Sequence, residues 1–149
     1  MRLVVQRVNS AKVVVAETGK VVGEIGKGLF VLLGVKDGDS EKDAKALAEK
    51  LAKLRVIADD AGKMNLSVKD VAVSVLVVSQ FTLYADTSKG NRPSFIKAAK
   101  PGHAEKLYEN FVDKLKEKGV KVETGSFGEY MEIDAKLDGP VTIIIESGD

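Results

Sequence analysis

Two short segments, far apart in the chain, hold the residues whose types could do chemistry. The segment 79–82 (Ser-Gln-Phe-Thr) follows a long apolar run, and Gly139–Pro140 precedes the last one. Each places polar or conformationally restricted residues where a strand would continue its apolar pattern, and such conflicts tend to mark functional sites. Neither segment contains a nucleophile beside a base. Any reaction here would depend on orienting a substrate rather than on a strong acid, base or nucleophile.

Several common chemistries are missing from the sequence. The chain has no cysteine, so it has neither disulfides nor a thiolate metal site. Its one histidine, His103, would have to build a catalytic triad or metal site alone, and we expect it to be a surface residue in a first helical turn. No phosphate-binding or dinucleotide-binding glycine loop is present. Asp134 and Asp138 lack a clear partner. We therefore expect no metal and no cofactor.

Length and composition indicate one globular domain over residues 1–149. The charged fraction is 30%, which argues against disorder, and no apolar run reaches the ~20 residues of a membrane helix. The first residues lack the apolar stretch of a signal peptide, so the chain is expected in the cytoplasm, with no membrane partner. The net charge of +1 argues against indiscriminate nucleic-acid binding, and DNA is not expected as a partner.

One local stretch is nevertheless basic. Between Thr87 and Ala104 the sequence contains four cations and no acidic residue. These cations are Lys89, Arg92, Lys97 and Lys100. Charge alone favours a solvated loop and a functional basic patch about equally.

The hydrophobic pattern predicts an α+β fold, with curled, mostly antiparallel β-sheets packed against two amphipathic helices. Helices are expected over residues 40–54, capped by Asp39 or Ser40, and between Pro101 and Gly119. Strands are expected at 2–8, 12–17, 20–25, 28–35, 55–58, within 71–84 as the longest strand, and at 120–123, 131–136 and 141–146. The apolar run Val141–Ile145 predicts a strand buried on both sides, and hence a dimer.

Taken one at a time, the two segments have ordinary explanations. Ser79 and Thr82 could end a strand with Gln80 facing water and Phe81 in the core, and Gly139–Pro140 could be a simple turn. Taken together, they belong to a longer series of blocks. These blocks are Val5–Val8, Gly28–Leu29, Leu33–Val35, Val77–Tyr84, Lys89–Phe95, Thr124–Gly128 and Gly139–Thr142.

With these blocks in order from end to end, the chain resembles the D-aminoacyl-tRNA deacylases, once described as D-tyrosyl-tRNA deacylases. The resemblance implies hydrolysis of the ester between a D-amino acid, or glycine, and the terminal ribose of tRNA, in homodimers with active sites at the interface. It places Ser79, Gln80, Phe81 and Thr82 in the pocket. Thr82 matches a threonine once proposed as nucleophile, whereas later views favour water assisted by the RNA 2′-hydroxyl.

The resemblance also implies a role for the second segment. Gly139–Pro140 would carry a cis peptide bond, reach into the partner's pocket, bind the α-amino group through its carbonyls and leave no room for an L side chain. Arg7 would brace this element, and the basic residues between Lys89 and Lys100 would contact tRNA phosphates. The missing acid, base and metal then make sense, because an aminoacyl ester is already activated and backbone N–H groups near 79–81 could stabilise its oxyanion.

Two positions depart from the family pattern. Leu137 stands where the family usually has asparagine, two residues before the glycine, and Glu129 follows Phe127-Gly128 where alanine is common. Leucine cannot make asparagine's hydrogen bonds. This departure favours the alternative of a non-catalytic tRNA-binding dimer of the same fold. A further alternative is a deacylase that acts on L-aminoacyl-tRNA.

Overall fold

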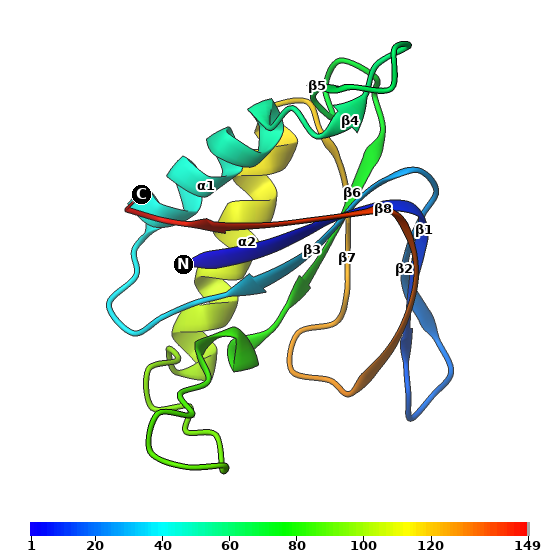
Figure 1. Cartoon of the computed structure of the whole chain (residues 1–149). Coiled ribbons are helices and arrows are strands. Elements are labelled where there is room, and N and C mark those ends of the chain that lie inside the picture. Colours follow the sequence, from blue (N-terminus) through cyan, green and yellow to red (C-terminus); the bar gives the residue numbers. More distant parts are fainter. Residues whose placement is uncertain (149) are drawn as a thin grey trace.

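Two helices cover one face of a curled β-sheet in the computed structural model, which describes residues 1–148 (Figure 1). The elements are β1 (Arg2–Val15), β2 (Val21–Ile25), β3 (Gly28–Gly34), α1 (Glu41–Lys53), β4 (Ile57–Ala58), β5 (Met64–Leu66), β6 (Ser74–Ser79), the 3₁₀ turn η1 (Phe81–Tyr84), α2 (Pro101–Glu117), β7 (Lys121–Thr124) and β8 (Met131–Glu146). The predicted α+β class with two amphipathic helices is confirmed.

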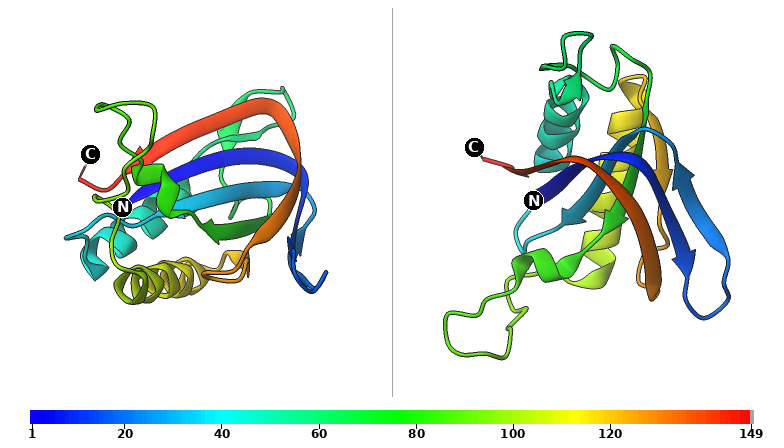
Figure 2. Two further views of the ribbon diagram at one scale, coloured as in Figure 1. Left: turned by 90° about the horizontal axis from the view of Figure 1, so that it is seen from below. Right: turned by 45° about the vertical axis from the view of Figure 1, so that its right-hand side comes forward.

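The long strand β1 organises the sheet. It pairs antiparallel with β8 along one edge, and along the other edge it pairs first with β3 and then with β2. Strands β6 and β7 continue the sheet beyond β3 in parallel. Strand β2 curls back so far that a Cβ atom added to Gly23 would stand 2.4 Å from the carbonyl oxygen of Thr124 in β7. The sheet nearly closes on itself (Figure 2), and in the described chain β8 pairs with β1 alone.

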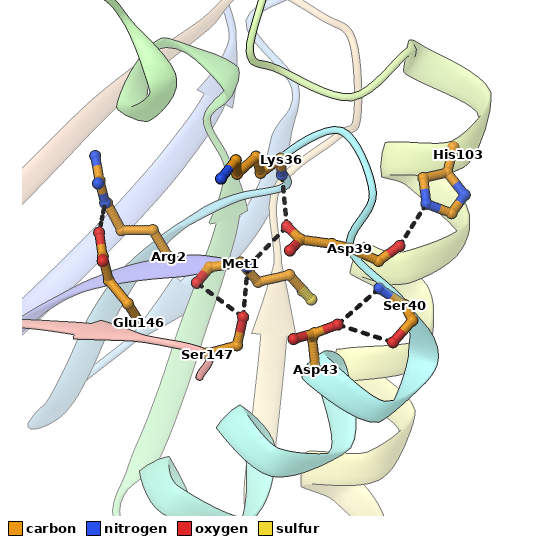
Figure 3. Close-up of polar contacts among 9 residues, drawn as sticks. All are labelled: Met1, Arg2, Lys36, Asp39, Ser40, Asp43, His103, Glu146 and Ser147. Atoms are coloured by element: carbon orange, nitrogen blue, oxygen red, sulfur yellow. Dashed lines mark hydrogen bonds and ion pairs between the residues drawn. The ribbon is translucent and has the colours of Figure 1, made fainter. Parts of the chain in front are cut away.

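Both helices bury the faces that their periodicity predicts. The buried side chains are Ala44, Leu47, Ala48, Leu51 and Ala52 in α1, and Leu107, Tyr108, Phe111, Val112 and Leu115 in α2. Burial of each large apolar side chain stabilises the fold by about 1.5–3 kcal/mol. Ser40 is the N-cap of α1, and its N–H donates to the Asp43 carboxylate at 2.8 Å. The exposed His103 donates from Nε2 to the carbonyl oxygen of Asp39 at 2.8 Å (Figure 3), which confirms it as a surface histidine.

Several predicted strand boundaries are wrong. Strands β1 and β8 are each continuous, where the sequence predicted two strands apiece. Their pairing shifts register between Gln6 and Ser10, so the two strands pass an irregularity without ending. The short strand β5, which pairs with β4, was not predicted.

The prediction of the longest strand within residues 71–84 is also wrong. Strand β6 ends at Ser79, and the chain then coils into η1. Gly34 at the end of β3 makes this possible, because a Cβ atom there would stand 3.0 Å from Leu83 Cβ and 3.2 Å from a ring carbon of Tyr84. The turn therefore lies directly against a backbone that has no side chain.

The run Val141–Ile145 is not buried on both sides within one chain. Ile145 is 7% exposed, but its neighbour Ile144 is 65% exposed. The alternation follows from the pleat, which sends successive side chains to opposite faces.

Candidate active site

A cavity of about 920 Å³ opens at the end of β6. Its walls come from the end of β6 and the start of η1, from residues 95–101 before and at the start of α2, from α2 itself, and from residues 127–133 leading into β8. Aromatic side chains stand around it, among them Phe81, Phe95 and Tyr130. Phe81 and Phe95 meet edge to face with ring centroids 5.1 Å apart. The cavity falls within the size range of small-molecule sites.

Three of the four predicted catalytic residues line this cavity, namely Ser79, Gln80 and Phe81. Thr82 follows them outside the lining, and its hydroxyl oxygen accepts a hydrogen bond from Gln80 Nε2. The Gln80 N–H already donates to the carbonyl oxygen of Leu33 at 2.8 Å, so it is not available as an oxyanion donor. The N–H groups of Phe81 and Thr82 are the first in η1 and have no acceptor within the turn.

Tyr108 of α2 lines the cavity and packs against the end of β6. Its hydroxyl donates to the carbonyl oxygen of Val77 at 2.8 Å, and its ring lies 5.9 Å from that of Phe127. The side chain is buried, and burial raises the pKa of Tyr108 to about 12. One hydrogen bond thus holds α2 against the strand that carries Ser79.

The raised pKa gives a testable pH dependence. Above the ordinary pKa of 10.0 the unfolded chain loses the Tyr108 proton while the folded chain keeps it to about 12. The free energy of unfolding should therefore fall between these values by up to about 1.4 kcal/mol per pH unit, and be unaffected by Tyr108 below them. Urea unfolding of Tyr108→Phe should show a shallower fall and, at pH 8, a loss of about 0.5–1.5 kcal/mol, because one hydrogen bond to the Val77 carbonyl oxygen is lost while the Gly125 N–H still donates to it. Equal slopes for both proteins would contradict this assignment.

The second predicted segment lies in β8, outside the lining of this chain's own cavity. The Gly139–Pro140 peptide bond is cis, and both residues are exposed. Arg7, whose side chain is 14% exposed, approaches the preceding residue from β1: Nε lies 3.1 Å from Asp138 Oδ2 and 3.4 Å from its carbonyl oxygen. Arg7 Nη1 also donates to the carbonyl oxygen of Val56 at 3.0 Å.

These contacts correct the prediction that Asp138 lacks a partner, and they bear on the effect of Leu137. Asp138 has a partner after all, namely Arg7, because the β1–β8 pairing brings the two together. Leu137 does not leave the segment unsupported, since the Arg7–Asp138 ion pair holds the next residue. The pairing of Asp138 with Arg7 was not predicted from the sequence. The position of Asp138 directly before Gly139 was the indication that the sequence offered.

The basic stretch forms a loop that projects from the body of the protein (Figure 1, green). Backbone hydrogen bonds of 2.8 and 2.9 Å between Asp86 and Ser94 close it. Lys97 pairs with Asp86 at 3.0 Å; hydrogen bonds from Ser88 and this lysine hold the pKa of Asp86 well below its usual range. Lys100 lines the cavity. Lys89 and Arg92, in contrast, lie in the exposed part of the loop.

Among residues 1–148, no three histidine or acidic side chains gather in a way that could hold a metal ion. Within the same residues, neither helix is long and apolar enough to cross a membrane.

The chain matches the family model described as D-Tyr-tRNA(Tyr) deacylase over residues 4–146. It belongs to this family. A D-aminoacyl-tRNA deacylase of Bacillus licheniformis is 58% identical over 147 residues, which cover 99% of each chain. One of Thermosipho melanesiensis is 54% identical, covering 99% of this chain and 97% of the relative. The length and identity of these matches confirm the resemblance seen in the sequence.

Two solved structures share the fold of this chain. A structure titled c-Myc DNA Unwinding Element Binding Protein superposes with a TM-score of 0.91 at 39% identity, covering 100% of both chains. A probable eukaryotic D-amino acid tRNA deacylase superposes with a TM-score of 0.85 at 17% identity, covering 97% of this chain and 98% of that one. At 17% identity, the second match shows a shared fold only.

Proposed function

We propose that the protein is a cytoplasmic D-aminoacyl-tRNA deacylase, formed by one domain over the whole chain. It hydrolyses the ester between a D-amino acid, or glycine, and the terminal ribose of tRNA, and releases the free amino acid and tRNA. The observation that carries this proposal is the cavity at the end of β6, lined by Ser79, Gln80 and Phe81, in a chain of this family.

The proposed mechanism uses backbone groups. A water molecule attacks the ester carbonyl carbon, the bond to the ribose oxygen breaks, and that oxygen takes a proton, with the RNA 2′-hydroxyl assisting. The N–H groups of Phe81 and Thr82 stabilise the oxyanion, since they lack acceptors within η1. Because the ester is already activated, orientation and these donors suffice without a side-chain base.

Replacing Thr82 tests the older nucleophile hypothesis. Thr82→Ala keeps the backbone N–H and removes the hydroxyl that accepts from Gln80 Nε2, together with the side-chain methyl group. We expect the rate of D-tyrosyl-tRNA hydrolysis to stay within about tenfold of the wild-type rate, equivalent to ~1.4 kcal/mol. A trapped acyl-Thr82 intermediate, or a loss of many orders of magnitude, would instead establish covalent catalysis.

We further propose that the protein works as a homodimer and that β8 forms much of the interface. In the described chain one edge of β8 has no strand partner, and such edges are usually covered. Ile144, Leu137 and Ile133 expose apolar side chains along the same strand. Gly139–Pro140 does not line its own cavity, which fits a role in the cavity of the partner.

A charge on this face should disrupt the dimer. Ile144→Lys would bury an ammonium group in the interface, where an unpaired charge costs several kcal/mol. Light scattering after gel filtration should give one chain per particle for the variant and two for the wild type, with deacylation lost in the monomer. The exposed Ile96 provides a control, because Ile96→Lys changes an apolar residue of the projecting loop and should leave the dimer intact. A dimeric Ile144→Lys variant would place the interface elsewhere.

Chiral selection is proposed to reside in Gly139 and Pro140. Their carbonyl oxygens would accept from the substrate α-ammonium and leave no space for an L side chain. Lys89 and Arg92 would meet tRNA phosphates, since Lys97 is already paired with Asp86. Such contacts position the RNA without reading its sequence.

The decisive experiment compares hydrolysis of D-tyrosyl-tRNA and L-tyrosyl-tRNA by purified protein without added metal. Rapid loss of the D-ester alone is the expected result. Loss of the L-ester alone would indicate the opposite chirality. Binding of tRNA with hydrolysis of neither ester would support a non-catalytic tRNA-binding dimer, the alternative that Leu137 favours.

A further inference from the structure

Arg2, at the start of β1, makes three contacts that converge on η1 and β8. Its Nη1 donates to the carbonyl oxygen of Leu83 at 2.6 Å. Its Nε pairs with the Glu146 carboxylate at the end of β8 (Figure 3). The guanidinium also lies over the ring of Tyr84, 4.9 Å from the centroid. Arg2 does not line the cavity, so none of these contacts touches the proposed substrate.

Other contacts hold η1 at its start, within the turn and through the buried side chain of Tyr84. At its start, the Gln80 N–H donates to the carbonyl oxygen of Leu33. Inside it, the hydrogen bond from Leu83 N–H to the Gln80 carbonyl is long, at 3.4 Å. Arg2 supplies the side-chain contact at its end, where a cation also suits the exposed carbonyl groups of a helical turn.

From this arrangement we propose that Arg2 is a positioning residue for deacylation: it holds the end of η1 and thereby aims the N–H groups of Phe81 and Thr82 at the oxyanion. The inference rests on the proposed function. Through Glu146, the same side chain also joins η1 to the strand that carries Gly139–Pro140.

Lysine cannot replace this arginine. The planar guanidinium presents separate N–H groups to Leu83 and Glu146 while its face covers Tyr84, whereas an ammonium has no planar fork. The Arg2 side chain is 34% exposed and that of Glu146 38%. An ion pair this exposed adds little stability, so its loss should change the reaction more than the fold.

The test measures kcat and KM for D-tyrosyl-tRNA in Arg2→Ala and Arg2→Lys. We expect kcat to fall about tenfold in both variants while KM stays within about twofold, because misaimed donors affect the transition state more than binding. Added methylguanidinium should restore part of kcat in Arg2→Ala. The preference for D over L should persist, since Gly139–Pro140 is untouched.

Arg55→Ala is the matched control. Arg55 likewise donates to a backbone carbonyl, from Nε to that of Asn65 in β5 at 2.8 Å, but lies outside the cavity lining. Its loss should leave kcat unchanged.

The outcomes separate the two proposals. An inactive wild type would overturn the proposed function and this inference with it. An active wild type whose kcat is unchanged in Arg2→Lys would overturn the inference alone. So would a fall in kcat that methylguanidinium does not relieve and that accompanies an equal loss of thermal stability, because Arg2 would then act only on folding.

Discussion

Gly139→Ala is expected to lower hydrolysis of D-tyrosyl-tRNA by ~100-fold or more, the loss that a displacement of about 1 Å can cause at a site relying on orientation. Gly139 has φ of +128°, a region that side-chain-bearing residues rarely adopt. An added Cβ atom would also stand 2.8 Å from the backbone nitrogen of Val141 and 2.9 Å from its Cγ2. The segment must therefore shift, and with it the carbonyl groups proposed to hold the substrate ammonium.

Gly19→Ala is the control for this experiment. Gly19 also has positive φ, at +71°, but a Cβ atom there meets nothing within 4 Å. It lies in the turn between β1 and β2, so the variant places a side chain at a positive φ without touching the site. Single-turnover rates for both esters should show loss of activity or of chiral preference only for Gly139→Ala. Equal, near-wild-type rates in the two variants would remove Gly139 from the site.

Arg7→Lys should reduce the rate by roughly 10- to 100-fold and weaken discrimination against L-tyrosyl-tRNA, because the substrate ammonium and side chain would be held less firmly. Arg7 holds Asp138 through its carboxylate and carbonyl and reaches Val56 with a second nitrogen. A lysine carries one ammonium group and cannot make these contacts together. The residue before Gly139 would lose its main side-chain restraint.

Asp138→Asn provides the graded comparison for Arg7→Lys. It removes the charge but leaves the carbonyl oxygen that accepts from Arg7 Nε, so its effect should be several times smaller. The ratio of D-ester to L-ester hydrolysis is the measurement that matters. If this ratio is unchanged in Arg7→Lys, Arg7 has no part in chiral selection.

Periodic and local features were predictable from the sequence. The apolar stripes of α1 and α2 appear at helical spacing, and the cap at Ser40 depends on Asp43 three residues away. The blocks that resemble the family are also contiguous, so the sequence alone identifies Ser79–Thr82 and Gly139–Pro140. These features depend on residues that are close together in the chain, so they can be recognised in the sequence.

The tertiary structure decided which distant groups meet. Residues 81–84 look like the end of a strand, yet they coil because Gly34, on another strand, offers a backbone without a side chain. Asp138 looks unpartnered until the β1–β8 register brings Arg7 beside it. Arg2 and Leu83 are 81 residues apart, and no local pattern links them. By itself, therefore, the sequence determined the two helices, the fold class and the family. Only the closing of the sheet, which sets such long-range contacts, decided how the site is supported.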